Sequence, residues 1–217
     1  GLVKKIHDKE IYLEIMDARF RFYYNMHEKV LQEAEGMIDF THIGEDLGTQ
    51  TSQVIDHDTF DRHFAPRFKQ YFDMVHSYGA RTMMHMCGFV KPFLGRLIEL
   101  GLDVYDVVQP TRPDADIALL QKEFGENLTF CGSVCVQTTL AFEKPERVIS
   151  EVEKRKKLFK KGGLFLGPSH AIQVGTPIEN IIALYKSAGS LAERIDDYIL
   201  SAANNHDDGK INMSKLF

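Results

Sequence analysis

The sequence lacks several features that would assign it to a broad class of protein. It has no run of about 18 consecutive apolar residues, so no membrane-spanning helix is expected. Its formal net charge is -5 and it has no basic block, which argues against nucleic acid as a partner. It has only three cysteines, an odd number, and no charged-then-apolar leader. These absences predict a reducing, cytoplasmic location and no disulfide framework.

The remaining composition is that of an ordinary globular protein. The chain has 217 residues, of which 44% are hydrophobic and 26% are charged. This is enough for one core, so we expect a single domain over residues 1–217. The chain begins with Gly1 rather than Met, which suggests a processed, tagged or truncated piece.

Apolar spacing predicts a helix followed by alternating strands and helices. The first helical pattern covers about residues 4–35 and precedes Gly36. Pro66 is expected to kink or break one helix, and Thr176 to be the N-cap of another. Strands are expected at 37–43, 80–87, 104–108, 128–131 and 164–166, and further helices at 60–77, 90–100, 114–124, 145–160, 176–188 and 191–203.

This order predicts an α/β fold with a parallel sheet. A doubly wound sheet and a barrel both fit, but regular strand-helix units favour a (β/α)8 TIM-barrel type. Five strands fall short of eight. We therefore expect an incomplete barrel that lacks the N-terminal strands, so that the chain is the C-terminal portion of such a barrel.

The stretch from Ala80 to Phe89 carries the first candidate metal ligands. His85 and Cys87 are two residues apart in a predicted strand, so their side chains face the same way. An imidazole and a thiolate side by side form half of a tetrahedral zinc site. The alternative is a core histidine beside a core cysteine.

Further polar residues follow other predicted strands. In parallel α/β folds, functional groups collect at the carboxyl ends of strands. Glu45, Asp46 and Gln50 follow the first strand, in what is either a substrate-facing loop or a solvated turn. Gln109 follows the third strand and His170 the last. His170 could join His85 and Cys87 as the third ligand of a catalytic zinc with an open fourth position.

Several of these motifs, in this order, resemble the uroporphyrinogen decarboxylase superfamily. The resemblance extends from Gly44 to about Ser187. The matching pieces are Glu45-Asp-Leu-Gly-Thr-Gln50, His85-Met-Cys-Gly88, Leu97-Ile-Glu-Leu-Gly-Leu-Asp-Val104, Gln109-Pro110, Phe124-Gly125, Phe130-Cys-Gly132, Gln137-Thr-Thr-Leu140, Gly162-Gly163, Pro168-Ser-His-Ala-Ile-Gln173 and Thr176-Pro-Ile-Glu-Asn180.

The resemblance implies a (β/α)8 barrel enzyme and is closest to the zinc- and corrinoid-dependent methyltransferase branch. That branch holds zinc with a His-x-Cys motif, here His85 and Cys87, and a later ligand that is usually Cys, here His170. It implies methyl transfer between a corrinoid protein and a thiol or other small acceptor. Glu45 and Asp46 would be catalytic, and Gln50, Gln109 and His170 would bind substrate.

Two alternatives stay open. A His at position 170 is also similar to the decarboxylase pattern, which implies metal-free decarboxylation of a porphyrinogen. The other alternative is an inactive barrel fragment, for which self-association, for example as a homodimer, would cover the open sheet edge.

Overall fold

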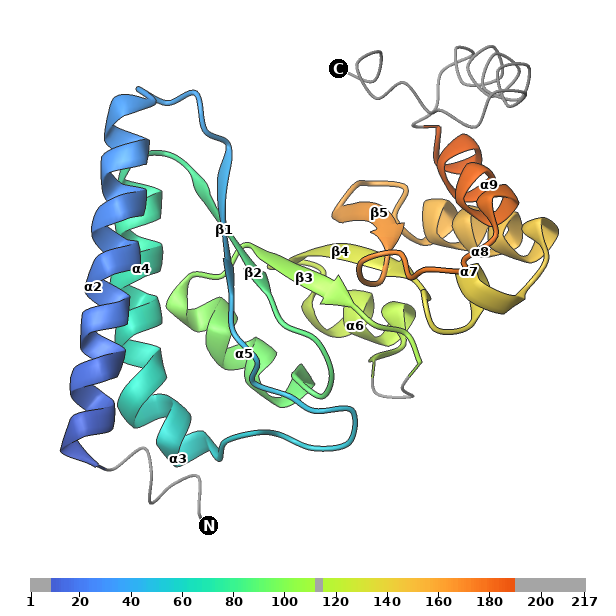
Figure 1. Ribbon diagram of the computed structural model, residues 1–217. Helices are drawn as coiled ribbons and strands as arrows, with labels where there is room; N and C mark the ends of the chain where they lie inside the picture. Colours follow the sequence, from blue (N-terminus) through green and yellow to red (C-terminus); the bar gives the residue numbers. More distant parts are fainter. Residues whose placement is uncertain (1–8, 112–114, 190–217) are drawn as a thin grey trace, which may run out of the picture.

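The computed structural model describes residues 9–111 and 115–189 (Figure 1). Its helices are α2 (Glu10–Glu33), α3 (His57–Thr59), a π-helical segment η1 (Phe60–Phe64), α4 (Ala65–Ser77), α5 (Lys91–Leu100), α6 (Ile117–Phe124), α7 (Thr139–Phe142), α8 (Pro145–Leu158) and α9 (Ile178–Ala188). Its strands are β1 (Phe40–Gly44), β2 (Arg81–His85), β3 (Val104–Val108), β4 (Thr129–Val134) and β5 (Leu164–Pro168). Within these ranges, no helix is both long and apolar enough to cross a membrane.

The strands form one sheet in which sequence order and spatial order agree. The order is β1-β2-β3-β4-β5, and every pair is parallel. A doubly wound sheet reverses its strand order at a switch point, and these five strands show no reversal. The predicted α/β fold is confirmed, and its winding is that of a (β/α) barrel.

A contact between the two outer strands shows that the sheet is strongly curved. Neighbouring strands lie about 4.8 Å apart, so β1 and β5 would be roughly 19 Å apart in a flat sheet. The rings of Phe40 on β1 and Phe165 on β5 have centroids only 6.0 Å apart. The five strands therefore form an arc, and these two rings lie on its concave face.

The register then fixes which side chains face the inside of the arc. His42 shares the face of Phe40 because the two are two residues apart. His42 pairs with Met83, and His85 pairs with Asp106, so these residues also lie on the concave face. The opposite face of β2 supplies Thr82, Met84 and Met86, which are all 0% exposed. The larger hydrophobic core packs on this convex side, between the strands and α2, α4, α5 and α6.

Element boundaries differ from the prediction at a few residues. Pro66 does interrupt a helix: the π-helical segment η1 ends just before α4, where Pro66 occupies the first turn. Thr176 is not an N-cap, because Pro177 takes the cap position and the helix starts at Ile178. β4 is longer than expected, and α7 was not expected. The helix predicted at 191–203, like residue 114 and the first residues of the opening helix, lies outside the described residues.

Candidate metal centre

Strand β2 positions the first two candidate ligands. Its side chains alternate between the buried convex face and the concave face, as predicted. His85 is the last residue of the strand and Cys87 follows it by two residues, so the alternation continues past the strand end. Both side chains are partly exposed. The pattern read from the sequence therefore places an imidazole and a thiol together at the carboxyl end of β2.

A backbone contact between two loops fixes the position of Cys87. The Phe89 amide donates a hydrogen bond to the carbonyl oxygen of Thr49, at 2.8 Å. Gly88 has φ +78°, and a Cβ on it would lie 2.4 Å from that same oxygen. A Cβ on Gly48 would lie 2.6 Å from the Phe89 nitrogen. Only glycine lets the loops after β1 and β2 approach this closely. The contact fixes the loop after β2, and with it the position of Cys87.

The end of β4 positions the third candidate ligand. The Ser169 amide donates to the carbonyl oxygen of Val134 at 2.7 Å, and the Ser169 hydroxyl accepts from the Val136 amide at 3.1 Å. Ser169 is completely buried, whereas His170 beside it is exposed. These hydrogen bonds attach the loop after β5 to the end of β4, and they set the position of His170.

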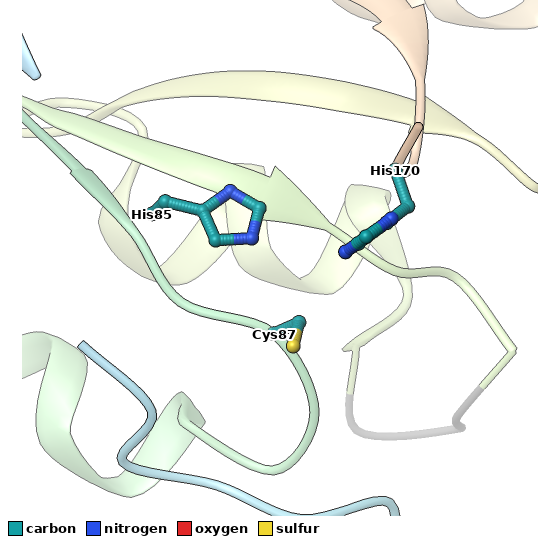
Figure 2. A group of neighbouring side chains, drawn as sticks. All are labelled: His85, Cys87 and His170. Carbon is teal, nitrogen blue, oxygen red and sulfur yellow. The ribbon is translucent and has the colours of Figure 1, made fainter. Parts of the chain in front are cut away.

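The three side chains converge at the carboxyl ends of the strands. One ligand atom from each of His85, Cys87 and His170 lies within 4.8 Å of the others. Figure 2 shows the His85 ring, the Cys87 sulfur and the His170 ring around one space, with a nitrogen of each ring directed into it. The centroids of the two rings are 5.6 Å apart. This set of nitrogen, sulfur and nitrogen donors is one that zinc prefers.

Asp106 on β3 supports this cluster through a hydrogen bond to one of its ligands, His85. Its Oδ2 accepts hydrogen bonds from His85 Nδ1 at 2.7 Å and from His42 Nε2 at 3.1 Å. The Asp106 residue is only 9% exposed. The bond to Nδ1 fixes the tautomer of His85 and leaves Nε2 free to bind a metal, which is the arrangement typical of histidines that ligate zinc.

Two cysteines near the cluster have raised pKa values. The Cys87 thiol lies 3.9 Å from Asp46 Oδ1, and both burial and this carboxylate raise its pKa. Burial raises the pKa of Cys131 to about 12, and its hydrogen bond to Asp106 adds to the effect. Cys131 lies on the concave face of β4 and is partly exposed. Both thiols are therefore protonated at neutral pH unless a cation binds.

The remaining predicted site residues divide between two places. Asp46 lies beside Cys87. Glu45 instead lines a pocket of about 170 Å³ between α2, β1 and α4, together with Arg19 and Arg67. Burial in this pocket raises the pKa of Glu45, although Arg19 opposes the shift. Its catalytic role stays a prediction, since the structure does not bring it to the three ligands.

The two glutamines have different surroundings. Gln109 is 7% exposed, and its Oε1 has no hydrogen-bond partner among the described residues. Gln50 is exposed in the loop after β1. The predicted roles of both in substrate binding stay predictions.

Sequence reasoning missed Asp106. The residue lies in the middle of Val104-Tyr-Asp-Val-Val108, which reads as a buried apolar strand. An acid inside such a run is itself a signal, because a buried carboxylate needs hydrogen-bond donors. The two histidines at hydrogen-bond distance are those donors.

Comparison with known families decides where the chain belongs. The family model of uroporphyrinogen decarboxylase (URO-D) matches residues 36–191. The chain belongs to the URO-D family. No curated protein sequence matches it significantly.

Solved structures share the fold of this chain. One that shares the fold is a methyltransferase from Methanosarcina mazei, with a TM-score of 0.65 and 19% sequence identity. The match covers 86% of this chain and 52% of that one. The chain thus spans about half the length of the methyltransferase. At this identity, the likeness shows that the two proteins share the fold.

Proposed function

We propose that this URO-D family chain carries the zinc site of a methyltransferase. The reaction would transfer a methyl group between a corrinoid protein and a thiol or other small acceptor. The observation that carries the proposal is the convergence of His85, Cys87 and His170, with one ligand atom from each within 4.8 Å of the others. Methyltransferase activity in a solved protein of the same fold supports it.

The donor set fits zinc better than other metals common in proteins. Magnesium and calcium prefer oxygen ligands, whereas the cluster offers two imidazoles and a thiol. Three protein ligands leave a fourth tetrahedral position for an acceptor, as in catalytic zinc sites. His170 is exposed, so the cluster is open to solvent on the side of this ligand. When bound, zinc would lower the pKa of an acceptor thiol and favour its nucleophilic thiolate.

The chain's own residues would hold and orient the reactants. Asp106 keeps the His85 ring in one tautomer and one orientation through the 2.7 Å hydrogen bond. Asp46, beside Cys87, would accept the proton that the acceptor loses. In such a transfer the acceptor sulfur would supply the electron pair of the new S–CH3 bond, and the corrinoid would be the leaving group that keeps the electrons of its bond to the methyl group.

One observation favours a second candidate, metal-free decarboxylation of a porphyrinogen. His170 is the most exposed of the three ligand residues, so it could contact a substrate directly. In that case the His85 imidazole would be held by Asp106 without binding a metal. Metal content distinguishes the two candidates.

The test is the zinc content of the purified chain and of matched variants. We expect about one zinc per chain in the parent, as for a catalytic site with three protein ligands. Cys87→Ser and His170→Ala should each lower the bound zinc. His57→Ala should leave it unchanged, because His57 is an exposed histidine on α3 outside the cluster.

The same preparations are then mixed with methylcobalamin and a small thiol. Demethylation of the cobalamin, followed by its absorbance, should require the zinc-loaded parent and fail in Cys87→Ser. A parent that binds far less than one zinc per chain after loading would contradict the proposal. Decarboxylation of a porphyrinogen by that metal-free parent would support the second candidate.

A further inference from the structure

A pocket on the convex side of the sheet carries charged groups that the proposed methyl transfer does not use. It lies between α2, the carboxyl end of β1 and α4, and its volume is about 170 Å³. Three of the residues that line it are charged: Arg19, Glu45 and Arg67. A cavity of about 150 Å³ is large enough to bind benzene, so this pocket can hold a small organic molecule.

The guanidinium of Arg67 is fixed in place and still has donors to offer. Its Nε donates to Asp17 Oδ1 at 2.9 Å, its Nη2 donates to the same oxygen, and its Nη1 donates to the carbonyl oxygen of His63. A guanidinium has five N–H groups, so these bonds to described residues leave one N–H on each terminal nitrogen. Such a pair of N–H groups can bind a carboxylate through both of its oxygens.

The three charges lie around one phenol, that of Tyr12. Burial and the negative charge of Glu45 raise the pKa of Tyr12, whereas the positive charges of Arg19 and Arg67 oppose the shift. Burial also raises the pKa of Glu45, and Arg19 opposes that shift as well. The pocket therefore presents a carboxylate and two guanidiniums within electrostatic reach of one another.

The rest of the pocket is mostly aromatic. Phe64 and Tyr71 are 9% and 4% exposed, whereas Arg19 is an exposed residue. The pocket thus has an apolar inner wall and a charged group on its solvent side. The partly buried side chains of Phe20 and Phe68 extend the apolar wall.

The signs of the charges favour a ligand that carries both kinds of charge. A carboxylic acid alone would bring its carboxylate close to that of Glu45, and an amine alone would bring its ammonium close to two guanidiniums. A zwitterion avoids both repulsions. Its carboxylate can meet Arg67 and Arg19, its ammonium can meet Glu45, and an apolar remainder can pack against the aromatic rings.

We propose that this pocket binds a small α-amino acid with an apolar side chain, of the size of valine, leucine or methionine. Arg67 binds the carboxylate through its two remaining N–H groups, with Arg19 beside it, and Glu45 binds the ammonium. The site is separate from the candidate metal centre, because Glu45 lines this pocket whereas the next residue, Asp46, lies beside Cys87.

The first measurement is isothermal titration calorimetry of the full 217-residue chain with L-valine, L-leucine and L-methionine. At least one of them should bind with a dissociation constant of about 1 mM or lower. Two analogues of the best ligand are then titrated, the acid without its amino group and the amine without its carboxyl group. Each should bind at least about tenfold more weakly, because it meets one unopposed like charge.

The second measurement assigns the two charges of the ligand to side chains. Glu45→Gln should weaken binding of the amino acid about tenfold or more and leave binding of the acid analogue unchanged or tighter. Arg19→Gln should weaken binding of the amino acid but not of the amine analogue. Glu14→Gln and Arg21→Gln are the matched controls, since both residues are exposed on α2 and neither lines the pocket. Thermal unfolding and zinc content should match the parent in all four variants.

Either of two results would overturn the proposal. One is that none of the three amino acids shows saturable binding up to about 10 mM. The other is that the acid analogue binds the parent as tightly as the amino acid does, which would mean that Glu45 does not receive an ammonium. Neither result depends on whether the chain binds zinc or transfers methyl groups.

Discussion

The two ends of strands β2 and β3 use the same chemistry for different purposes. At the amino end, Asp103 accepts hydrogen bonds from His76 Nε2 at 2.7 Å and from the Thr82 amide at 2.8 Å. Toward the carboxyl end, Asp106 accepts from His85 Nδ1, also at 2.7 Å. Each aspartate thus holds a histidine in place. They differ in what the histidine does with its second nitrogen.

At the amino end, the carboxylate joins structural elements. Asp103 connects α4, through His76, to the first residues of β2, and Arg81 adds an ion pair at 3.2 Å. Toward the carboxyl end, the free nitrogen of His85 faces Cys87 and His170 (Figure 2). The same carboxylate-imidazole pair therefore contributes to stability at one end of the sheet and prepares a metal ligand at the other.

The largest expected effect comes from replacing Gly88, and Gly79 at the opposite end of β2 is its control. The two glycines have φ values of +78° and +79°. A Cβ on Gly88 would lie 2.4 Å from a backbone oxygen, whereas one on Gly79 would have nothing within 4 Å. We expect Gly88→Ala to lower the free energy of unfolding by about 3 kcal/mol and Gly79→Ala by about 1 kcal/mol. Urea denaturation measures both.

Gly88→Ala should also weaken zinc binding, because the displaced loop carries Cys87. Gly79→Ala should leave zinc affinity unchanged. Equal losses of stability in the two variants would show that the loop contact after β2 does not constrain the site.

The next effect tests the aspartate beside the ligands. Asp106→Asn removes the charge that holds the His85 tautomer. Substitution of a residue that hydrogen-bonds a metal ligand typically lowers metal affinity about 10–100-fold. We expect a loss in that range, measured by competition with a chromogenic chelator. Asp103→Asn is the control and should bind zinc as the parent does. If both variants bind zinc equally well, Asp106 does not contribute to the metal site more than Asp103 does.

A smaller effect on stability is expected from Asp103→Asn. Burial of Asp103 opposes its charged form, but hydrogen bonds from Thr82 and His76 outweigh burial, so its pKa lies below 3.8. A lowered pKa stabilises the folded state at pH values above the unfolded pKa, and this contribution is lost as the pH falls through the folded pKa. At neutral pH we expect the free energy of unfolding of the variant to be lower by about 1–2 kcal/mol, since the neutral amide oxygen of Asn is a weaker acceptor for Thr82 and His76 than the carboxylate.

The pH dependence distinguishes this explanation from a simple packing defect. The difference in the free energy of unfolding between parent and variant should shrink as the pH falls below 3.8, where Asp103 becomes protonated. Urea denaturation from neutral pH to about pH 3 measures it. A difference that stays constant would mean that the charge of Asp103 is unimportant.

The smallest effect is expected at His42, the second donor to Asp106. Its side chain is 50% exposed, and its hydrogen bond to Asp106 is 3.1 Å long. His42→Gln keeps a donor at this position, so we expect zinc affinity to fall by less than about threefold, under 1 kcal/mol. The chelator competition assay applies here too. A loss as large as that of Asp106→Asn would place His42 among the ligands.

The sequence predicts most of the fold because local patterns decide it. The alternation along β2 is confirmed by the burial of Met84 and Met86 and the partial exposure of His85 and Cys87. Glycines after helices and strands also indicate most element ends. The N-cap predicted at Thr176 was wrong. The fixed φ of proline suits both the first helical residue and extended backbone, and Pro177, with ψ 132°, is extended, so the helix starts one residue later than predicted.

The candidate site is predicted less completely because it depends on long-range pairing. The sequence alone does not show that Asp106 meets His42 and His85, which are 64 and 21 residues away. The placement of Glu45 follows from the register. Gly44 pairs with His85 on the concave face, so the next side chain points to the convex side and enters the pocket beside α2.

The candidate ligands come from two separately packed parts of the chain. His85 and Cys87 flank Met86 in the larger hydrophobic cluster. His170 follows Ser169, whose hydrogen bonds run to Val134 and Val136 in the smaller cluster with α8 and α9. An ion bound by all three ligands would tie these parts together, and opening of the smaller one would release a ligand. By thermodynamic linkage, zinc should slow amide hydrogen exchange in α8 and α9, far beyond its own ligands.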